Sequence, residues 1–248
     1  MSATGRKRHA PKPHAPRSSP EARTVPIPAV NLGPLVPTSR SVKIAKNGVY
    51  GQRQTIRDPD DNYATPEWCL EAIWPHVRPA SGVILDPCAG SGAVLRFVAA
   101  RYDKALVNGC ELDRERCDTA AGHAWCQHGD WLADDHPRTL RGVWPKLILT
   151  NPPYRLALPF IQKAIEMVRP AGGAVCMLLR VNFLASQKRA DWMREHTPDV
   201  WVLPRRPSFT PDNKTDATEY AWMVWNTQRK GHARVAILAV PEKVRAAR

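Results

Sequence analysis

An apolar run that stops abruptly at two prolines constrains the fold of this chain more than any other feature. Residues 147–149 are Leu-Ile-Leu, and Thr-Asn-Pro-Pro-Tyr follows at 150–154. A continuous apolar run is typical of a parallel strand that is covered on both faces. Pro152 and Pro153 each fix φ and lack an N–H group, so the strand must end before them. We therefore predict a stiff loop at the carboxyl end of a buried strand, where open α/β sheets bind their ligands.

The groups of this loop suit a planar amine. The side-chain oxygen of Asn151 and the carbonyl oxygen of Pro152 are two acceptors to which one amino group can donate both of its hydrogens. These hydrogen bonds would draw the nitrogen lone pair out of conjugation and toward an electrophile, while the ring of Tyr154 stacks on a base. The alternative interpretation is a proline-stiffened turn with no chemical role.

A second apolar run leads into a glycine loop. Residues 83–87 are Val-Ile-Leu-Asp-Pro, and Gly90 and Gly92 precede an apolar helical segment at 93–99. Glycine lets the backbone turn sharply and lets a ligand approach it closely, and the N–H groups at a helix start attract a carboxylate. Dinucleotide binding would also use such a loop, but the third spaced glycine of that motif is missing.

An acidic residue ends the next predicted strand. Residues 105–110 form a mainly apolar segment, and Glu111 follows it. An acid at the end of the second strand of such a sheet can accept hydrogen bonds from both hydroxyls of a ribose. A solvated surface carboxylate is the alternative.

The apolar spacing between Trp68 and Val77 predicts a helix before the glycine loop. Thr65 is a suitable N-cap, Pro66 would occupy the first helical position, and the helix should end before Pro79. Tyr63 and Thr65 either serve only to start this helix or take part in the site.

The rest of the chain alternates between helical and strand patterns. We predict helices at 114–125 and 156–168, and strands at 174–179, 200–203, 220–225 and 235–240. This order indicates an α/β fold with a doubly wound sheet.

In this order, the Asp-Pro glycine loop, the acidic strand end and the Asn-Pro-Pro-Tyr segment resemble S-adenosylmethionine-dependent amino-methyltransferases. The similarity covers about residues 60–225. It is greatest to the compact, Dam-like adenine-N6 DNA methyltransferases of phages and prophages, which also have an aromatic-x-Thr-Pro segment. The resemblance implies a Rossmann-like class I methyltransferase domain, a mixed sheet of about seven strands and S-adenosylmethionine as methyl donor. It further implies that the target base is flipped out of its helix.

The resemblance also assigns roles to individual residues. Those implied to be catalytic are Asn151, Pro152, Pro153 and Tyr154. Those implied to bind the cofactor are Tyr63, Thr65, Pro66, Asp86, Pro87, Ala89, Gly90, Gly92, Glu111, Leu112, Asp130 and Trp131. Asp130 matches the acid that receives the adenine amino group of the cofactor.

The charge of the chain points to a polyanionic partner. The net charge is +13, and residues 1–57 hold eleven Lys or Arg against the single acid Glu21. We expect residues 1–57 to be a disordered basic arm and residues 58–248 to form the methyltransferase domain. The arm either follows a nucleic-acid backbone or is only a solubilising tail. A basic, aromatic loop supplies further candidates for nucleic-acid contact: Arg205, Arg206, Phe209 and Lys214.

Several classes of protein are disfavoured. No apolar run approaches the roughly 20 residues that span a bilayer, and the chain start lacks an apolar signal core, so we expect a cytoplasmic protein. The six cysteines lie mostly in apolar segments, which fits a reducing compartment. We expect no metal, because Cys117, His123, Cys126 and His128 lack the close paired spacing of a zinc site. A monomer or weak dimer is expected.

The chain departs from larger family members because no segment is long enough for a separate target-recognition domain. DNA, duplex or single-stranded, is therefore the expected partner, but the target sequence is open. The alternatives are an RNA amino-methyltransferase, a protein glutamine-N5 methyltransferase, or a nucleic-acid-binding protein that keeps the cofactor without turnover.

Overall fold

One mixed sheet organises the described part of the chain. The computed structural model describes residues 64–133, 142–209, 215 and 217–241. Tyr63, Lys214 and the whole arm at 1–57 lie outside these residues. The strands are β1 (Ile84–Asp86), β2 (Val107–Glu111), β3 (Trp125–His128), β4 (Leu147–Thr150), β5 (Ala174–Arg180), β6 (Asp199–Val202), β7 (Tyr220–Asn226) and β8 (Val235–Ile237).

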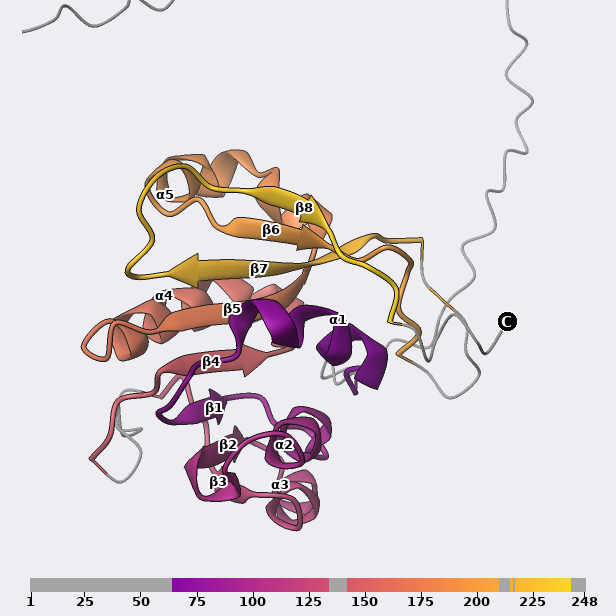
Figure 1. The fold of residues 1–248 in the computed structure, drawn as a ribbon, viewed down its shortest axis with the longest axis vertical. Helices are drawn as coiled ribbons and strands as arrows, with labels where there is room; N and C mark the ends of the chain where they lie inside the picture. The colour runs from indigo at the N-terminus through magenta and orange to yellow at the C-terminus, as the bar shows by residue number, and fades with distance from the viewer. Residues whose placement is uncertain (1–63, 134–141, 210–214, 216, 242–248) are drawn as a thin grey trace, which may run out of the picture. The chain divides into compact units, whose positions relative to one another are not determined.

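The strand order is β3-β2-β1-β4-β5-β7-β6-β8. All neighbours are parallel except β7, which runs antiparallel to both β5 and β6, and its arrow points opposite to theirs (Figure 1). The predicted α/β class and the doubly wound mixed sheet are therefore confirmed. The described sheet has eight strands rather than about seven, because β8 pairs in parallel with β6 as an additional edge strand.

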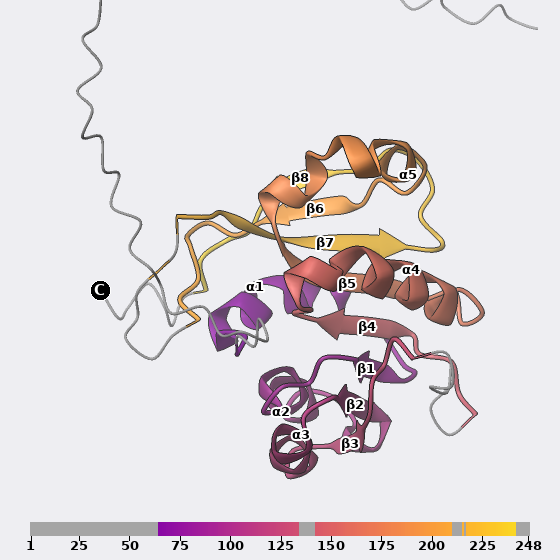
Figure 2. The same cartoon turned by 180° about the vertical axis from the view of Figure 1, so that it is seen from behind.

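Helices cover both faces of this sheet. The helices are α1 (Glu67–Val77), α2 (Ala93–Ala99), α3 (Arg114–Ala121), α4 (Ala157–Val168) and α5 (Ala190–Glu195), with short 3-10 turns at Lys104–Leu106, Tyr154–Leu156, Val181–Leu184 and Gln187–Arg189. The core residues of α1, α2 and α3 pack on one face, and those of α4 and α5 pack on the other (Figures 1 and 2). Across the described residues, no helix is both long and apolar enough to cross a membrane.

The central strands are buried on both faces, as their continuous apolar sequence predicts. Leu147 and Leu149 point into the core under α1 and α2, whereas Ile148 points into the core under α4. All three are at most 1% exposed. The strand ends at Thr150, directly before the two prolines.

Two local predictions about helix ends are wrong. Pro66, not Thr65, is the N-cap of α1, and no side chain caps that end, because the Thr65 side chain is turned into the cavity described below. The helix predicted at 114–125 ends at Ala121, and Trp125 starts β3 instead. Residues 125–128 form β3 because they pair in parallel with residues 108–111 of β2. This strand pairing overrides the local helical pattern.

Candidate active site

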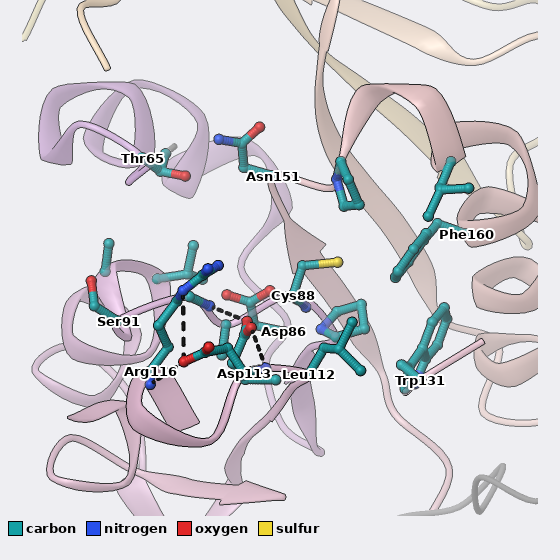
Figure 3. Close-up of a pocket in the computed structure, with 18 of the residues that line it drawn as sticks. Thr65, Asp86, Cys88, Ser91, Leu112, Asp113, Arg116, Trp131, Asn151 and Phe160 are labelled. Carbon is teal, nitrogen blue, oxygen red and sulfur yellow. Dashed lines mark hydrogen bonds and ion pairs between the residues drawn. The ribbon is translucent and has the colours of Figure 1, made fainter. Parts of the chain in front are cut away.

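A cavity of about 480 Å³ lies at the carboxyl ends of β1, β2 and β4. Figure 3 shows Thr65 and Asn151 at one end, Trp131 and Phe160 at another, and Asp86 and Cys88 between them. The lining residues are Ala64, Thr65, Asp86, Pro87, Cys88, Ala89, Gly90, Ser91, Ala93, Val94, Glu111, Leu112, Asp113, Arg116, Gly129, Asp130, Trp131, Leu132, Asn151, Pro153, Arg155, Leu156 and Phe160. A cavity of this size suits a small-molecule cofactor.

The glycine loop between β1 and α2 forms one wall. Gly90 and Gly92 have φ angles of 52° and 89°, a region that favours glycine. A Cβ on Gly92 would lie 2.8 Å from the His123 ring and 2.9 Å from the Cα atom of Ala120. Gly92 is therefore required for the approach of α2 to α3, whereas Gly90 itself lines the cavity.

Glu111 connects this loop to the end of β2. Its Oε2 atom accepts a hydrogen bond from the N–H group of Gly90 at 2.8 Å, and its Oε1 atom accepts one from the backbone N–H group of Asp113 at 3.0 Å. The residue is only 8% exposed, and it still lines the cavity. The carboxylate predicted to bind a ribose thus also fixes the position of the glycine loop.

Asp86 carries a strongly perturbed carboxyl group at the floor of the cavity. The side chain is 2% exposed, and its Oδ1 atom accepts a hydrogen bond from the N–H group of Cys88 at 3.1 Å. Burial raises the pKa of Asp86 to about 7, and the nearby negative charge of Glu111 adds to that rise, while the neighbouring Thr150 hydroxyl and the hydrogen bond from the Cys88 N–H group oppose it. A cationic ligand group beside Asp86 would favour its ionised form.

Apolar and aromatic groups form the far side of the cavity. Trp131 stacks on Phe160 with their ring centroids 5.3 Å apart. Leu112 and Leu156 are 67% and 47% exposed, large values for leucines that line the same cavity. Asp130 follows β3 at this side, and its Oδ1 atom accepts a hydrogen bond from the N–H group of Leu132 at 2.9 Å. This side therefore offers apolar faces and one carboxylate to a planar ring.

Asn151 and Tyr154 form a hydrogen-bonded pair at the end of β4. The hydroxyl of Tyr154 donates to Oδ1 of Asn151 at 3.0 Å. The Tyr154 ring packs at a tilt on Tyr220, with centroids 5.8 Å apart, and the guanidinium carbon of Arg180 lies 5.0 Å from its centroid. Asn151 and Pro153 line the cavity, whereas Pro152 is buried and Tyr154 lies beside the lining residues.

The loop that we predicted to contact nucleic acid follows β6, at the same edge of the sheet as the cavity. Arg205 lies over the ring of Trp68 with its guanidinium carbon 4.6 Å from the centroid. Arg206 donates from Nε to Glu219 at 2.9 Å. Phe209 packs edge-on against Tyr220 at 5.1 Å between centroids, which joins this loop to the Tyr154 ring.

Most of the predicted cofactor residues meet in this one cavity. Those that line it are Thr65, Asp86, Pro87, Ala89, Gly90, Glu111, Leu112, Asp130 and Trp131, whereas Pro66 and Gly92 do not. The sequence interpretation missed Arg116, Arg155 and Phe160. Phe160 lies on the buried side of α4, where a core role explains its apolar character equally well, so no sequence signal separates the two. Among the described residues, no group of three or more His, Cys, Asp or Glu side chains is placed to hold a metal ion.

The fold is similar to that of several solved methyltransferase and restriction-modification structures. The type I restriction-modification methyltransferase subunit from Streptococcus thermophilus matches with a TM-score of 0.54 and 16% identity, over 75% of this chain and 53% of that chain. A modification subunit of a putative type I restriction enzyme from Vibrio vulnificus YJ016 gives 0.53 and 16%, over 73% and 48%. A putative class I S-adenosylmethionine-dependent methyltransferase from Listeria monocytogenes gives 0.50 and 13%, over 73% and 65%.

The chain spans about half the length of the two restriction-modification subunits. No protein-family model and no curated protein matches the sequence. At these identities the similarity concerns the fold. The chain therefore has the fold of the class I S-adenosylmethionine-dependent methyltransferases.

Proposed function

We propose that this protein transfers a methyl group from S-adenosylmethionine to the exocyclic N6 amine of adenine in DNA. The observation that carries the proposal is that Asn151 lines the same cavity as the glycine loop and Glu111. One cavity therefore joins Asn151, one of the two proposed acceptors for a planar amine, to the groups suited to the cofactor.

The residues present fit S-adenosylmethionine, which supplies an electrophilic methyl group on a sulfonium. Four carboxyl groups line the cavity, those of Asp86, Glu111, Asp113 and Asp130, and they suit a ligand with a sulfonium, an ammonium and two ribose hydroxyls. The exposed faces of Leu112 and Leu156 suit an adenine ring, since apolar faces bury a planar ring while a few polar groups fix its orientation.

Asn151 and Pro152 would hold the target amine in this site. The hydrogen bond from Tyr154 fixes the orientation of the Asn151 amide, and a carbonyl oxygen keeps a second lone pair for a target hydrogen. These acceptors become more effective as the amine nitrogen pyramidalises, so they favour the transition state over the ground state. Positioning at about 3 to 3.5 Å and exclusion of water would supply much of the acceleration. As the nitrogen attacks the methyl group, the bond to the sulfonium sulfur breaks and leaves a thioether. The methylated amine is then cationic and acidic and loses one proton to water after the transfer, so the mechanism needs no dedicated general base.

The distribution of charge supports a polyanionic substrate. Of the four carboxyl groups, Asp86 and Glu111 end β1 and β2, whereas Asp113 and Asp130 lie in the loops after β2 and β3. In contrast, an arginine ends β5, and arginines follow β4 and β6. The arginines on this second half are Arg155, Arg180, Arg205 and Arg206. A cationic cofactor would meet the four carboxyl groups, beside which Arg116 and Arg155 also line the cavity, and an anionic strand would meet the arginines at the ends of β4, β5 and β6.

A substrate panel tests the proposal directly. The full chain is incubated with methyl-labelled S-adenosylmethionine and duplex DNA, single-stranded DNA, RNA or protein, and the labelled product is hydrolysed and identified by mass spectrometry. We expect N6-methyladenine from DNA. Label in N4-methylcytosine, in RNA alone or in glutamine would contradict the assignment of the substrate.

A further inference from the structure

Two adjacent arginines follow β6, and the structure distinguishes them although the sequence does not. Arg206 is held by Glu219, to which its Nε atom donates at 2.9 Å. Arg205 instead lies over the ring of Trp68, with its guanidinium carbon 4.6 Å from the centroid. Among the residues that the structure describes, Arg205 forms no ion pair or hydrogen bond, and its Nε atom is buried without a partner. Its charge is therefore not shared with an acid of the described chain.

Trp68 offers this guanidinium a fixed platform. The residue lies in the first turn of α1, where the N–H group of Cys69 donates to the carbonyl oxygen of Pro66 at 3.0 Å. The carbonyl oxygen of Cys69 in turn accepts a hydrogen bond from Nε1 of Trp222 on β7, also at 3.0 Å. The Trp68 ring packs against the core under this helix. Both the ring and the backbone beside it are thus tied to the sheet.

The loop that carries Arg205 is connected to the amine-binding loop. Two residues before Arg205, the N–H group of Leu203 donates to the carbonyl oxygen of Tyr220 at 3.0 Å. The Tyr220 ring contacts the Tyr154 ring, whose hydroxyl donates to Asn151. Because β4 and β6 run in the same direction, the loops after them lie at the same edge of the sheet, and α1 begins at this edge (Figure 1). The stack of Arg205 on Trp68 is therefore on the side from which a target base would reach Asn151.

A guanidinium stacked on a ring can bind a phosphate at the same time. Stacking uses the flat face of the group, while its N–H donors lie in the plane and form a fork that matches phosphate oxygens. The Arg205 side chain is partly exposed, and its two Nη groups carry the donors that remain beside the buried Nε atom. The aromatic face also limits the orientations of the guanidinium, so less freedom is lost when a ligand binds.

We propose that Trp68 and Arg205 form a phosphate site for the DNA strand that carries the target base, in which Arg205 binds the phosphate and Trp68 is a positioning residue. This inference rests on the proposed function. It assigns a role to Trp68, which belongs to none of the motifs considered above.

The salt dependence of DNA binding tests the charge of Arg205. The affinity of the full chain for duplex DNA is measured by fluorescence anisotropy across a series of salt concentrations. For Arg205→Gln, the slope of log K against log salt should become shallower by about 0.9, as expected for one lost phosphate contact. Arg205→Lys should keep the slope, because an ammonium neutralises the same phosphate.

Arg101→Gln is the matched control for the loss of a stacked guanidinium. Arg101 also lies over an aromatic ring, with its guanidinium carbon 3.9 Å from the centroid of Phe97, but it pairs with Glu67. This variant should leave the salt slope unchanged.

A double-mutant cycle tests the role of Trp68. At one fixed salt concentration, Trp68→Leu should weaken DNA binding by about two- to thirty-fold, the range expected for one lost cation–π contact. In the Arg205→Gln background the same substitution should have no further effect, because no guanidinium is left to position. Affinity for S-adenosylmethionine, measured by calorimetry, should be unchanged in every variant and shows that each is folded. Trp68→Met, which fills more of the space of the indole, takes the place of Trp68→Leu if the latter does not fold.

The outcomes distinguish this inference from the function on which it rests. An unchanged salt slope in Arg205→Gln, or an equal change in Arg101→Gln, would overturn the phosphate contact. Equal effects of the Trp68 substitution in the two backgrounds would overturn its positioning role. These measurements concern binding alone, whereas an unmodified protein that binds DNA but methylates none would contradict the proposed function and leave the phosphate site in place.

Discussion

A single hydrogen bond prepares Asn151 for its proposed role. An asparagine amide can present either its oxygen or its nitrogen to a substrate, and only the oxygen accepts hydrogens from an amine. The Tyr154 hydroxyl donates to Oδ1 at 3.0 Å, which selects one of the two orientations. The side chain is therefore oriented by a neighbouring residue of the same loop.

Asn151→Ala should lower kcat by about 100-fold or more, as expected when a group that acts chiefly in the transition state is removed. Its affinity for S-adenosylmethionine should stay within about twofold, because Glu111 and the glycine loop remain intact. Initial rates and calorimetry measure the two quantities. Asn226→Ala is the control, since Asn226 is exposed at the opposite end of the sheet. Full activity of Asn151→Ala would rule out the mechanism.

The raised pKa of Asp86 predicts that cofactor affinity depends on pH. Because burial raises this pKa to about 7, the carboxyl group of the free protein is mainly protonated below pH 7. A cationic ligand favours the ionised form, so binding should release a proton below pH 7 and become tighter as pH rises. Above the raised pKa, the affinity should level off.

Titration of S-adenosylmethionine between pH 5.5 and 8.5 by calorimetry tests this dependence, with roughly up to a tenfold change in Kd per pH unit for one linked proton. Asp86→Asn should give a flat profile. The substitution removes the Asp86 carboxyl group and leaves every other titrating group in place. A profile that stays steep in Asp86→Asn would assign the titration to such a group instead.

At the scale of elements, strands and the loops after them could be predicted better than helix ends. The apolar runs before Asp86, Glu111 and Asn151 locate β1, β2 and β4, because a strand buried on both faces needs apolar residues throughout. The end of α3 could not be predicted, because the register with β2 decides where β3 begins. The role of Leu156 and Phe160 in lining the cavity could not be predicted either, because both look like ordinary apolar residues of a helical segment.

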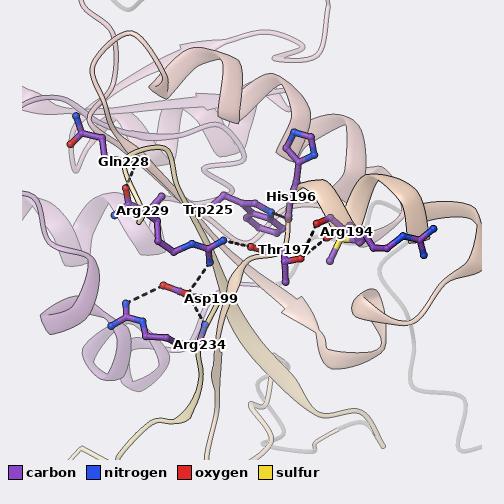
Figure 4. A network of polar contacts seen from close by, with 10 residues as sticks. Arg194, His196, Thr197, Asp199, Trp225, Gln228, Arg229 and Arg234 are labelled. Atoms are coloured by element: carbon purple, nitrogen blue, oxygen red, sulfur yellow. Dashed lines mark hydrogen bonds and ion pairs between the residues drawn. The ribbon is translucent and has the colours of Figure 1, made fainter. Parts of the chain in front are cut away.

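The edge strand β8 is tied to the sheet by one buried carboxylate. Figure 4 shows Asp199 between Arg229 and Arg234. Asp199 accepts hydrogen bonds from Nη1 of Arg229 at 2.9 Å and from the backbone and Nη2 of Arg234 at 2.8 and 3.0 Å. Burial alone would raise the pKa of Asp199, but the hydrogen bonds from Arg234 and Arg229 outweigh it and hold the pKa below its usual range.

Asp199→Asn should lower the free energy of unfolding by about 1 to 3 kcal/mol at pH 7, because it weakens charge-assisted hydrogen bonds at a buried site whose arginine partners are partly exposed. Urea unfolding measures this difference. A lowered folded-state pKa contributes stability above the unfolded pKa and loses it as pH falls through the folded value, so the difference should shrink in acid.

Asp191→Asn is the matched control for the edge strand. Asp191 pairs with Arg194 on α5, but both side chains are largely exposed, at 94% and 73%. Exposed pairs contribute little, so this variant should be nearly neutral. Amide exchange should speed up at residues 235–237 only in Asp199→Asn. Equal effects of the two substitutions would show that Asp199 does not anchor β8.

At the scale of the whole molecule, arginines lie at or after the ends of β4, β5 and β6, where we propose that the substrate binds. Arg155 lines the cavity, Arg180 lies over the Tyr154 ring, and Arg205 follows β6 and lies over Trp68. Under the proposed function, we expect these side chains and the basic arm at residues 1–57 to contribute to DNA affinity. Backbone contacts of this kind bind without reading bases, which predicts a short or relaxed target sequence.

The last prediction concerns the arm at residues 1–57, whose eleven basic residues should provide sequence-independent affinity. Each phosphate that the arm neutralises on duplex DNA should add about 0.9 to the slope of log K against log salt. Replacing these eleven Lys and Arg by Gln keeps the length of the chain and should flatten the slope by several such steps. Turnover at saturating DNA should remain, because Asn151 and the cofactor cavity lie in the catalytic domain. A slope equal to that of the unmodified protein would show that the arm does not contact DNA, and the arginines at the ends of β4, β5 and β6 would then have to supply the affinity alone.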